Sequence, residues 1–201
     1  MSDAQRTHGE EGNTPLDEDE MEGLIPSHIS TRAELNAWEA ENIRLAIEWT
    51  SSHAMDILDA EVLIALHRRM FDQTWRWAGK YRTSEKSISP QPWPEVPRLV
   101  RDLIENTREQ LPHTNCQPGM LDDLAVRFHH QLVVIHPWPN GNGRHARLAT
   151  DLLLRRHGRT EFTWGRATHS GDGPAARRAY LLALREADAG TYDALQRFVR
   201  G

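Results

Sequence analysis

The chain has 201 residues, 38% of them hydrophobic and 26% charged, and a formal net charge of −5 at pH 7. This size and composition suit one compact domain and exclude two large ones, while short apolar runs and an acidic N-terminus exclude a membrane span and a signal peptide, so we expect a cytoplasmic protein. The lone Cys116 excludes an internal disulfide and a cysteine-based zinc site.

Residues 1–22 form an acidic segment that we expect to be flexible. It carries eight acids against the single base Arg6, a charge of −7, whereas the remaining residues carry 21 acids and 23 bases. No apolar periodicity supports a packed helix there. The balance of +2 in the rest of the chain lacks the clear basic excess of most nucleic-acid-binding proteins, so we expect no direct contact with nucleic acid.

The apolar spacing that follows predicts an all-α domain with one short β interruption. Thr31 and Glu34 have the pattern of a capping box, and they open a helix that runs to the Ser51–Ser52 break. Asp59 caps a second helix, which we expect to end at Gly79.

The segment Lys80–Pro94 is polar and β-prone and contains several prolines, which predicts a loop or a small hairpin. Apolar residues at helical spacing then predict further helices. These run from Leu99 to Leu111, from Leu121 to Ile135, from Leu148 to about Gly158, and over 174–189 and 191–200.

The stretch from His136 to Arg144, HPWPNGNGR, joins two of these helices and has the composition of an anion site. Gly141 and Gly143 allow positive φ, so successive backbone N–H groups can face one point at the start of the next helix. Arg144 and Arg147, one turn apart, can bind further phosphate oxygens on the same side. His136 can take a proton from an incoming hydroxyl, which predicts phosphoryl or nucleotidyl transfer. The alternative is a simple turn with solvated arginines.

This stretch resembles the signature of the Fic (Fido) family, which is His-Pro-Phe, any residue, an acid or Asn, Gly-Asn-Gly-Arg, and a second Arg three residues later. Trp138, in place of Phe, departs from it. The segments 66–71 and 77–83 also resemble the family's helix and the entry to its flap. In size and in the Trp-Gly-Arg segment at Trp164, the chain resembles the short Fic proteins called mobile mystery protein B. The resemblance implies a Fic-type helical bundle with a short β-hairpin flap over residues 23–201.

The resemblance implies transfer of AMP from ATP, with Mg²⁺, to a Ser, Thr or Tyr hydroxyl of a target protein. His136 would be the general base. The residues that it implies for nucleotide binding are Asn140, Gly141, Asn142, Gly143, Arg144 and Arg147, with Tyr180 and Asp188 at the adenine. Asn140 takes the place of an acid that binds Mg²⁺ in many Fic enzymes, and a neutral amide is a poorer ligand for that cation. The implied flap residues, which would bind the target backbone as an added strand, are Ile88, Ser89, Pro90 and Gln91.

Two other functions stay open. A Fic enzyme can transfer another phosphate-containing group, such as UMP, phosphocholine or a γ-phosphate, although an intact Gly-Asn-Gly-Arg favours AMP. The chain can instead be a nucleotide-responsive binding module for a regulatory protein partner, with little catalysis, which Asn140 and the acidic segment favour. The resemblance also implies a homodimer. A metal centre among His129, His130, His136 and His145 is disfavoured, because no carboxylate lies among them.

The segment Thr7–Asn13 matches the pattern of the family's inhibitory helix, in which Ser or Thr precedes Glu by four positions and Gly or Asn follows. By that resemblance Glu11 would pair with Arg147 and block the γ-phosphate. Gly9 and Gly12 weaken a helix, so an acidic tail without a switch is the alternative.

Overall fold

The computed structural model describes residues 18–53, 55–114, 117–166 and 174–201. Within these ranges the fold is helical, which confirms the predicted all-α class, and the β-structure there is one isolated bridge between Leu24 and Trp75. None of the helices in the described ranges is long and apolar enough to cross a membrane.

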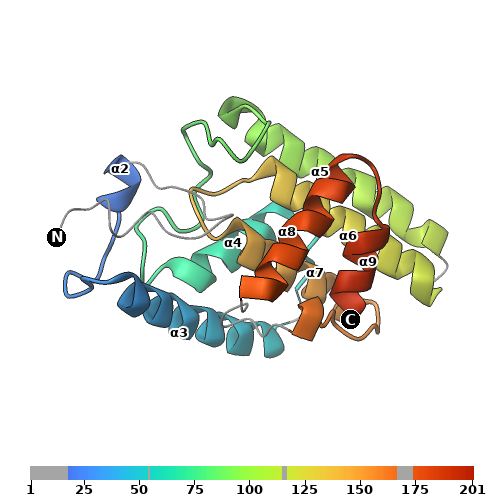
Figure 1. The fold of residues 1–201 in the computed structure, drawn as a ribbon, viewed down its shortest axis with the longest axis horizontal. Helices are drawn as coiled ribbons and strands as arrows, with labels where there is room; N and C mark the ends of the chain where they lie inside the picture. Colours follow the sequence, from blue (N-terminus) through green and yellow to red (C-terminus); the bar gives the residue numbers. More distant parts are fainter. Residues whose placement is uncertain (1–17, 54, 115–116, 167–173) are drawn as a thin grey trace.

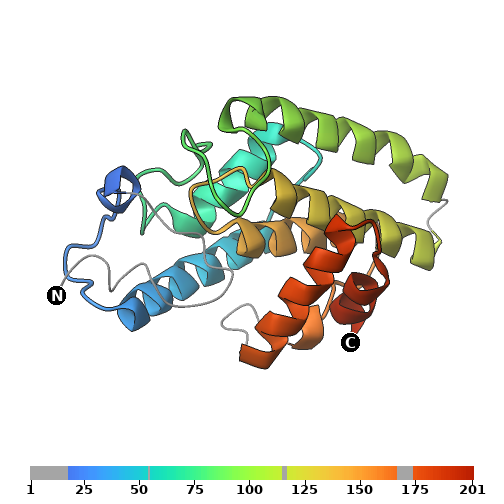
Figure 2. The ribbon, with the colours of Figure 1, turned by 45° about the horizontal axis from the view of Figure 1, so that its top comes forward.

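The α6–α7 pair lies at the centre of the molecule (Figures 1 and 2). Helix α5 runs beside α6, α4 packs on α7, and α3 packs on α4, while α8 and α9 pack together at the other end. The helices are α2 (Glu18–Met21), α3 (Arg32–Ser51), α4 (Ala60–Phe71), α5 (Val96–Gln110), α6 (Pro118–Ile135), α7 (Asn142–Arg156), α8 (Pro174–Asp188) and α9 (Asp193–Arg200). Short 3₁₀ helices are η1 (Trp93–Glu95), η2 (Leu111–Thr114) and η3 (Trp164–Arg166).

The first two long helices begin at the residues that the sequence predicts. The Thr31 hydroxyl accepts the Glu34 N–H at 3.2 Å, and the Glu34 carboxylate accepts the Thr31 N–H at 2.9 Å. The Asp59 carboxylate accepts the Glu61 N–H at 2.8 Å. Each cap satisfies backbone donors that the first turn of a helix leaves unpaired, so both predicted starts are confirmed.

Helix α4 ends at Phe71, so the predicted end at Gly79 is wrong. In the next turn the Asn42 side chain of α3 accepts hydrogen bonds from the Gln73 N–H at 3.1 Å and from the Thr74 hydroxyl at 3.3 Å. These bonds fix the chain against α3 in a non-helical conformation. Because the acceptor lies on another helix, the local spacing of apolar residues could not indicate this end.

Residues 80–92 form an irregular loop, so the predicted β-hairpin is not formed. Arg82 is 1% exposed, and its guanidinium donates to the carbonyls of Gln91 at 2.6 Å and of His136 at 2.8 Å. Carbonyls that bind Arg82 do not serve a strand ladder, and Pro90 has no N–H to give to one. The loop therefore folds around a charged side chain.

Two clusters of buried apolar side chains form the core, and α6 and α7 contribute to both. One cluster joins these helices to α3, α4 and α5, and includes Phe71, Leu132 and Leu153. The other joins them to η3, α8 and α9, and includes Leu121 and Leu154. Each fully buried leucine or phenylalanine stabilises the fold by about 2 kcal/mol. The loop between α6 and α7 is thus fixed by packing on both sides.

Part of the predicted acidic segment is described. Glu18–Met21 form α2, and the Glu20 carboxylate pairs with the Lys86 ammonium at 2.5 Å. Glu11 lies outside the described residues, so the inhibitory helix and the flexibility of that segment remain predictions.

Candidate active site

The loop of residues 137–141 is held by the side chains next to it. The Asn142 amide accepts the Trp138 N–H at 2.9 Å and donates to the Trp138 carbonyl at 2.8 Å. The Asn140 side chain accepts the Gly141 N–H at 2.5 Å. The side chain of Asn142, which the resemblance placed at the nucleotide, therefore holds the loop in shape.

His67 of α4 supports the same loop. Its Nδ1 accepts the Gly79 N–H at 2.9 Å, so Nε2 carries the proton and donates to the Asn140 carbonyl at 3.1 Å. The ring stacks on Trp138 with the centroids 4.4 Å apart. Burial lowers the pKa of His67 well below its usual value, and nearby His145 lowers it further. His67 thus holds the loop by its hydrogen bond to the Asn140 carbonyl and by its stacking on Trp138.

Gly141 takes φ +78°, as predicted, and directly precedes α7. A Cβ at this position would lie 2.5 Å from Phe71 Cζ, so glycine is required for space as well as conformation. Gly143 lies inside α7 and does not take the predicted positive φ, because the helix has already begun there. The candidate anion site is thus the first turn of α7, where the backbone N–H groups lack helical acceptors.

His136 lies at the other end of this loop. It follows α6 in the left-handed region, with φ 53° and ψ 62°, and is 4% exposed. Burial lowers the pKa of His136 to about 4, and the Arg82 guanidinium contributes in the same direction. The imidazole is therefore neutral at pH 7 and can accept a proton.

The two arginines of α7 contact different elements. Arg144 donates to the Glu39 carboxylate of α3 at 2.7 Å and lies over the Phe71 ring, 4.9 Å from its centroid. Arg147 is 8% exposed and lies over the Tyr180 ring of α8 at 4.5 Å. The two arginines thus contact different helices, and their binding of phosphate oxygens from one side stays a prediction.

Of the two residues predicted at the adenine, Tyr180 of α8 places its hydroxyl close to the start of α7. Its hydroxyl is 3.9 Å from the Cβ position of Gly143 and hydrogen-bonds His129 Nε2 at 2.9 Å. Asp188 instead hydrogen-bonds His130 Nε2 at 2.8 Å. Eight residues of α8 separate the two by about 12 Å along the helix axis.

The predicted flap residues lie against the end of α6, beside His136. The Ser89 hydroxyl donates to the Val134 carbonyl at 2.9 Å and accepts the Gln91 N–H at 3.2 Å. Ile88 is 43% exposed and Pro90 is exposed. The structure thus brings this loop next to His136, with Ser89 as the attachment point.

Residues 57–154 match the Fic/DOC family. The chain contains a Fic domain. A probable protein adenylyltransferase of Aquifex aeolicus is 29% identical over 128 residues, which is 60% of this chain and 34% of that protein. A uridine 5'-monophosphate transferase of Xanthomonas campestris pv. campestris is 37% identical over 67 residues, which is 31% of this chain and 12% of that protein. The chain thus spans about a third of the length of these relatives or less.

The fold agrees with a solved structure of the family. BepC from Bartonella tribocorum, crystallised with bound AMPPNP, superposes with a TM-score of 0.72 at 16% sequence identity, covering 92% of this chain and 97% of that one. At this identity the likeness shows the fold alone. It confirms the helical Fic architecture of this domain.

The described part of the Fic domain has few side chains that could coordinate a metal ion. Among the residues that the structure describes, no three His, Cys, Asp or Glu side chains are grouped to hold one. Ring nitrogens of His129, His130 and His145 hydrogen-bond other protein groups. For Mg²⁺, Asn140 supplies one neutral oxygen, which already accepts the Gly141 N–H. The residues present do not fit a Mg²⁺ site, so we derive no step through this ion.

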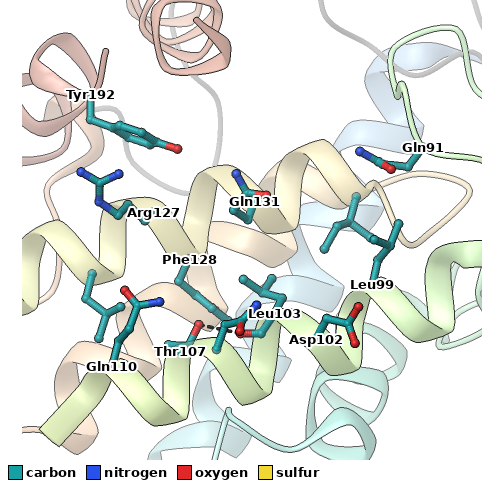
Figure 3. Close-up of a pocket in the computed structure, with 13 residues that line it drawn as sticks. Gln91, Leu99, Asp102, Leu103, Thr107, Gln110, Arg127, Phe128, Gln131 and Tyr192 are labelled. Atoms are coloured by element: carbon teal, nitrogen blue, oxygen red, sulfur yellow. Dashed lines mark hydrogen bonds between the residues drawn. The ribbon is translucent and has the colours of Figure 1, made fainter. Parts of the chain in front are cut away.

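A groove of about 510 Å³ runs between α5 and α6 of the Fic domain (Figure 3). Leu103 and Phe128 line it together with the amide of Gln131. Its charged residues, Asp102 and Arg127, each form an ion pair within their own helix. The groove therefore has no excess positive charge for phosphates, and the first turn of α7 is the better anion site.

Proposed function

We propose that this Fic domain transfers AMP from ATP to a hydroxyl group of a target protein. The observation that carries the proposal is the placement of a buried, neutral His136 at one end of a rigid loop, with the start of α7 and Arg144 at the other end. This arrangement combines a proton acceptor with an anion site. The adenylyltransferase named among the relatives and the AMPPNP bound by BepC support ATP as the substrate.

In the proposed reaction, His136 takes the proton from a Ser, Thr or Tyr hydroxyl of the target. The hydroxyl oxygen then attacks the α-phosphorus, a new P–O bond forms, and the bond from the α-phosphorus to the bridging oxygen breaks. Pyrophosphate leaves with the electron pair of that bond. The first N–H groups of α7 and Arg144 hold the phosphates in line and stabilise the developing charge.

The target enters, in this proposal, over the loop of residues 80–92. Ile88 and Pro90 present an exposed apolar surface, and Ser89 fixes this part of the loop to the end of α6. A backbone docked there would place its hydroxyl beside His136. Tyr180, 3.9 Å from the Cβ position of Gly143, would bound the nucleotide on its other side.

The experiment is labelling of protein in a cell extract by ATP that carries the label at the α-phosphate, with γ-labelled ATP in parallel. His136→Ala should lower α-phosphate labelling by at least about 100-fold, because it removes the general base, while ATP binding persists. His157→Ala, at a partly buried histidine beyond α7, is the matched control. Labelling by the His136→Ala protein at the parental rate would contradict the role of His136.

A second function has one specific observation in its favour. Because the Asn140 side chain bonds its own loop, this domain would bind a divalent cation poorly and turnover would be low, which suits a nucleotide-responsive binding module for a regulatory partner. ATP binding measured by calorimetry, with no label transferred from either phosphate position, would support this function. Labelling by α-labelled UTP in preference to ATP would instead indicate UMP transfer, which the Xanthomonas relative's name describes.

A further inference from the structure

Glu39 is a buried acid on α3, close to the proposed site. It is 5% exposed and lies on the same helix face as Leu35 and Ile43, which are core residues. A carboxylate in such a position is costly unless it is paired and hydrogen-bonded. Its partners therefore decide what it does.

Each carboxylate oxygen of Glu39 has its own partner. Oε1 accepts the indole N–H of Trp75 at 2.7 Å, and Oε2 accepts Arg144 Nη1 at 2.7 Å. Trp75 is 1% exposed and stacks on Trp77 with the ring centroids 5.0 Å apart. One oxygen is thus fixed by a buried donor, and the other is aimed at Arg144.

Arg144 is held a second time by the Phe71 ring, which lies 4.9 Å from the guanidinium carbon. The same ring fills the space next to Gly141, where a Cβ would lie 2.5 Å from Phe71 Cζ. The guanidinium and the start of α7 therefore rest on a common support. The Arg144 side chain is still 32% exposed, so it also reaches the solvent beside α7.

The contact between Glu39 and Arg144 is through a single guanidinium nitrogen. Among the described residues, no other protein acceptor is recorded for the Arg144 guanidinium. A guanidinium has five N–H donors in a fixed fork, so a one-nitrogen contact leaves an edge for a phosphate. Glu39 can therefore hold Arg144 while the arginine binds an anion.

We propose that Glu39 is a positioning residue, which holds the Arg144 guanidinium ready for the nucleotide phosphates. This inference rests on the proposed function, because it requires that Arg144 contact those phosphates. Glu39 acts through Arg144 and does not touch the nucleotide. A flexible arginine that is fixed beforehand loses less conformational freedom when the nucleotide binds.

The test is a double-mutant cycle on nucleotide affinity. Glu39→Gln keeps an oxygen for the Trp75 indole but removes the charge at Arg144, so it should weaken ATP binding up to about tenfold, the size of the conformational freedom that an unfixed arginine loses on binding. Arg144→Ala should also weaken ATP binding. In the Arg144→Ala background, Glu39→Gln should have no further effect. Calorimetry with ATP and with adenosine gives the readout, and adenosine affinity should not change.

Glu48→Gln is the matched control, because Glu48 pairs with Arg44 on the exposed face of the same helix. Circular dichroism and a thermal melt show that each variant is folded. An equal loss of ATP affinity with and without Arg144 would overturn the inference, since Glu39 would then act through the fold. Tighter ATP binding by Glu39→Gln would also overturn it, because the carboxylate would then compete with phosphate. If the parent binds ATP and the Glu39→Gln variant binds it with the same affinity, the positioning role alone is refuted. If the parent binds no ATP, the proposed function is refuted as well.

Discussion

The loops on the two sides of His136 each form around a polar side chain of their own segment, but those side chains reach over very different distances in the sequence. In the loop of residues 137–141, Asn142 bonds both backbone groups of Trp138, four positions away. In the loop of residues 80–92, Arg82 bonds Gln91 and also the carbonyl of His136, which is 54 positions away. The bonds of the first loop are thus mostly local, with His67 of α4 as a distant support, whereas the second loop depends on the packed end of α6.

This contrast separates two kinds of constraint around one base. A loop whose bonds are mostly local depends less on the rest of the fold, so substitutions there change the site more than the fold. A loop that surrounds a buried guanidinium forms only together with the helix that it bonds, so a substitution of Arg82 affects the whole domain. The base lies at the junction, and the three predictions that follow test this difference.

The largest effect is expected for Arg82→Met, which keeps the apolar stem and removes the guanidinium. The carbonyls of Ser84, Gln91 and His136 then lose their donor inside the protein, at roughly 1–3 kcal/mol for each group that stays buried. We expect the free energy of unfolding to fall by about 4 kcal/mol in urea titrations.

Arg98→Met is the matched control for Arg82. Its guanidinium is 55% exposed and pairs with Glu95 and Asp102 on the surface, so its loss should change the free energy of unfolding far less than the loss of the Arg82 guanidinium. Similar losses for the two variants would contradict a fold that depends on the buried guanidinium.

A smaller loss of stability is expected for Gly141→Ala in the locally determined loop. The positive φ costs about 1 kcal/mol for a residue with a Cβ, and the contact with Phe71 adds about 2 kcal/mol of overpacking. Gly158→Ala provides the control, because Gly158 has φ +69° and no atom within 4 Å of its Cβ position. In thermal melts the free energy of unfolding should therefore fall by about 3 kcal/mol in Gly141→Ala and by about 1 kcal/mol in Gly158→Ala. Equal costs would mean that Phe71 gives way, and that the loop is not tightly held.

Most of the helices could be predicted because their signals are local. The capping box of α3 and the apolar spacing of α3 and α6 are local signals, and the motif loop carries its glycines, His136 and Arg144 within nine residues. The end of α4 and the loop around Arg82 could not be predicted, since both depend on acceptors or donors far away in the sequence. The predicted helix start at Leu148 lies six residues after the observed start of α7 at Asn142, because a glycine such as Gly143 fits both a turn and a first helical turn.

The missed site residues share one property, which is a polar side chain at a buried position. Glu39 lies among the apolar residues of α3 and bonds Arg144, 105 positions away. His67 lies among those of α4 and bonds the Asn140 carbonyl, 73 positions away. The sequence contains the signal, since polar residues interrupt the apolar faces of both helices. It does not contain the partner, which only the packed fold brings near.

The smallest expected effect concerns the influence of the Arg82 charge on the pKa of His136. Burial and the Arg82 guanidinium hold the pKa of His136 at about 4, below the ordinary 6.5. Between these values the unfolded chain binds a proton that the folded protein does not, so this group lowers stability as pH falls from 6.5 to 4, by at most about 1.4 kcal/mol per pH unit. Arg82→Gln removes the nearby charge and should raise the pKa of His136 toward 6.5.

Titration of the His136 ring carbon by NMR measures this shift directly, under conditions where circular dichroism shows the variant to be folded. Because the raised pKa reduces the proton uptake on unfolding, the stability gap between parent and Arg82→Gln should narrow from pH 6.5 to pH 4. Lys86→Gln should shift the same pKa less, since the Lys86 ammonium contributes less than Arg82. An unchanged pKa in Arg82→Gln would mean that burial alone keeps His136 neutral. The loop around Arg82 would then support the base only by its shape, and the two loops would differ in how they fold but not in what they do to the base.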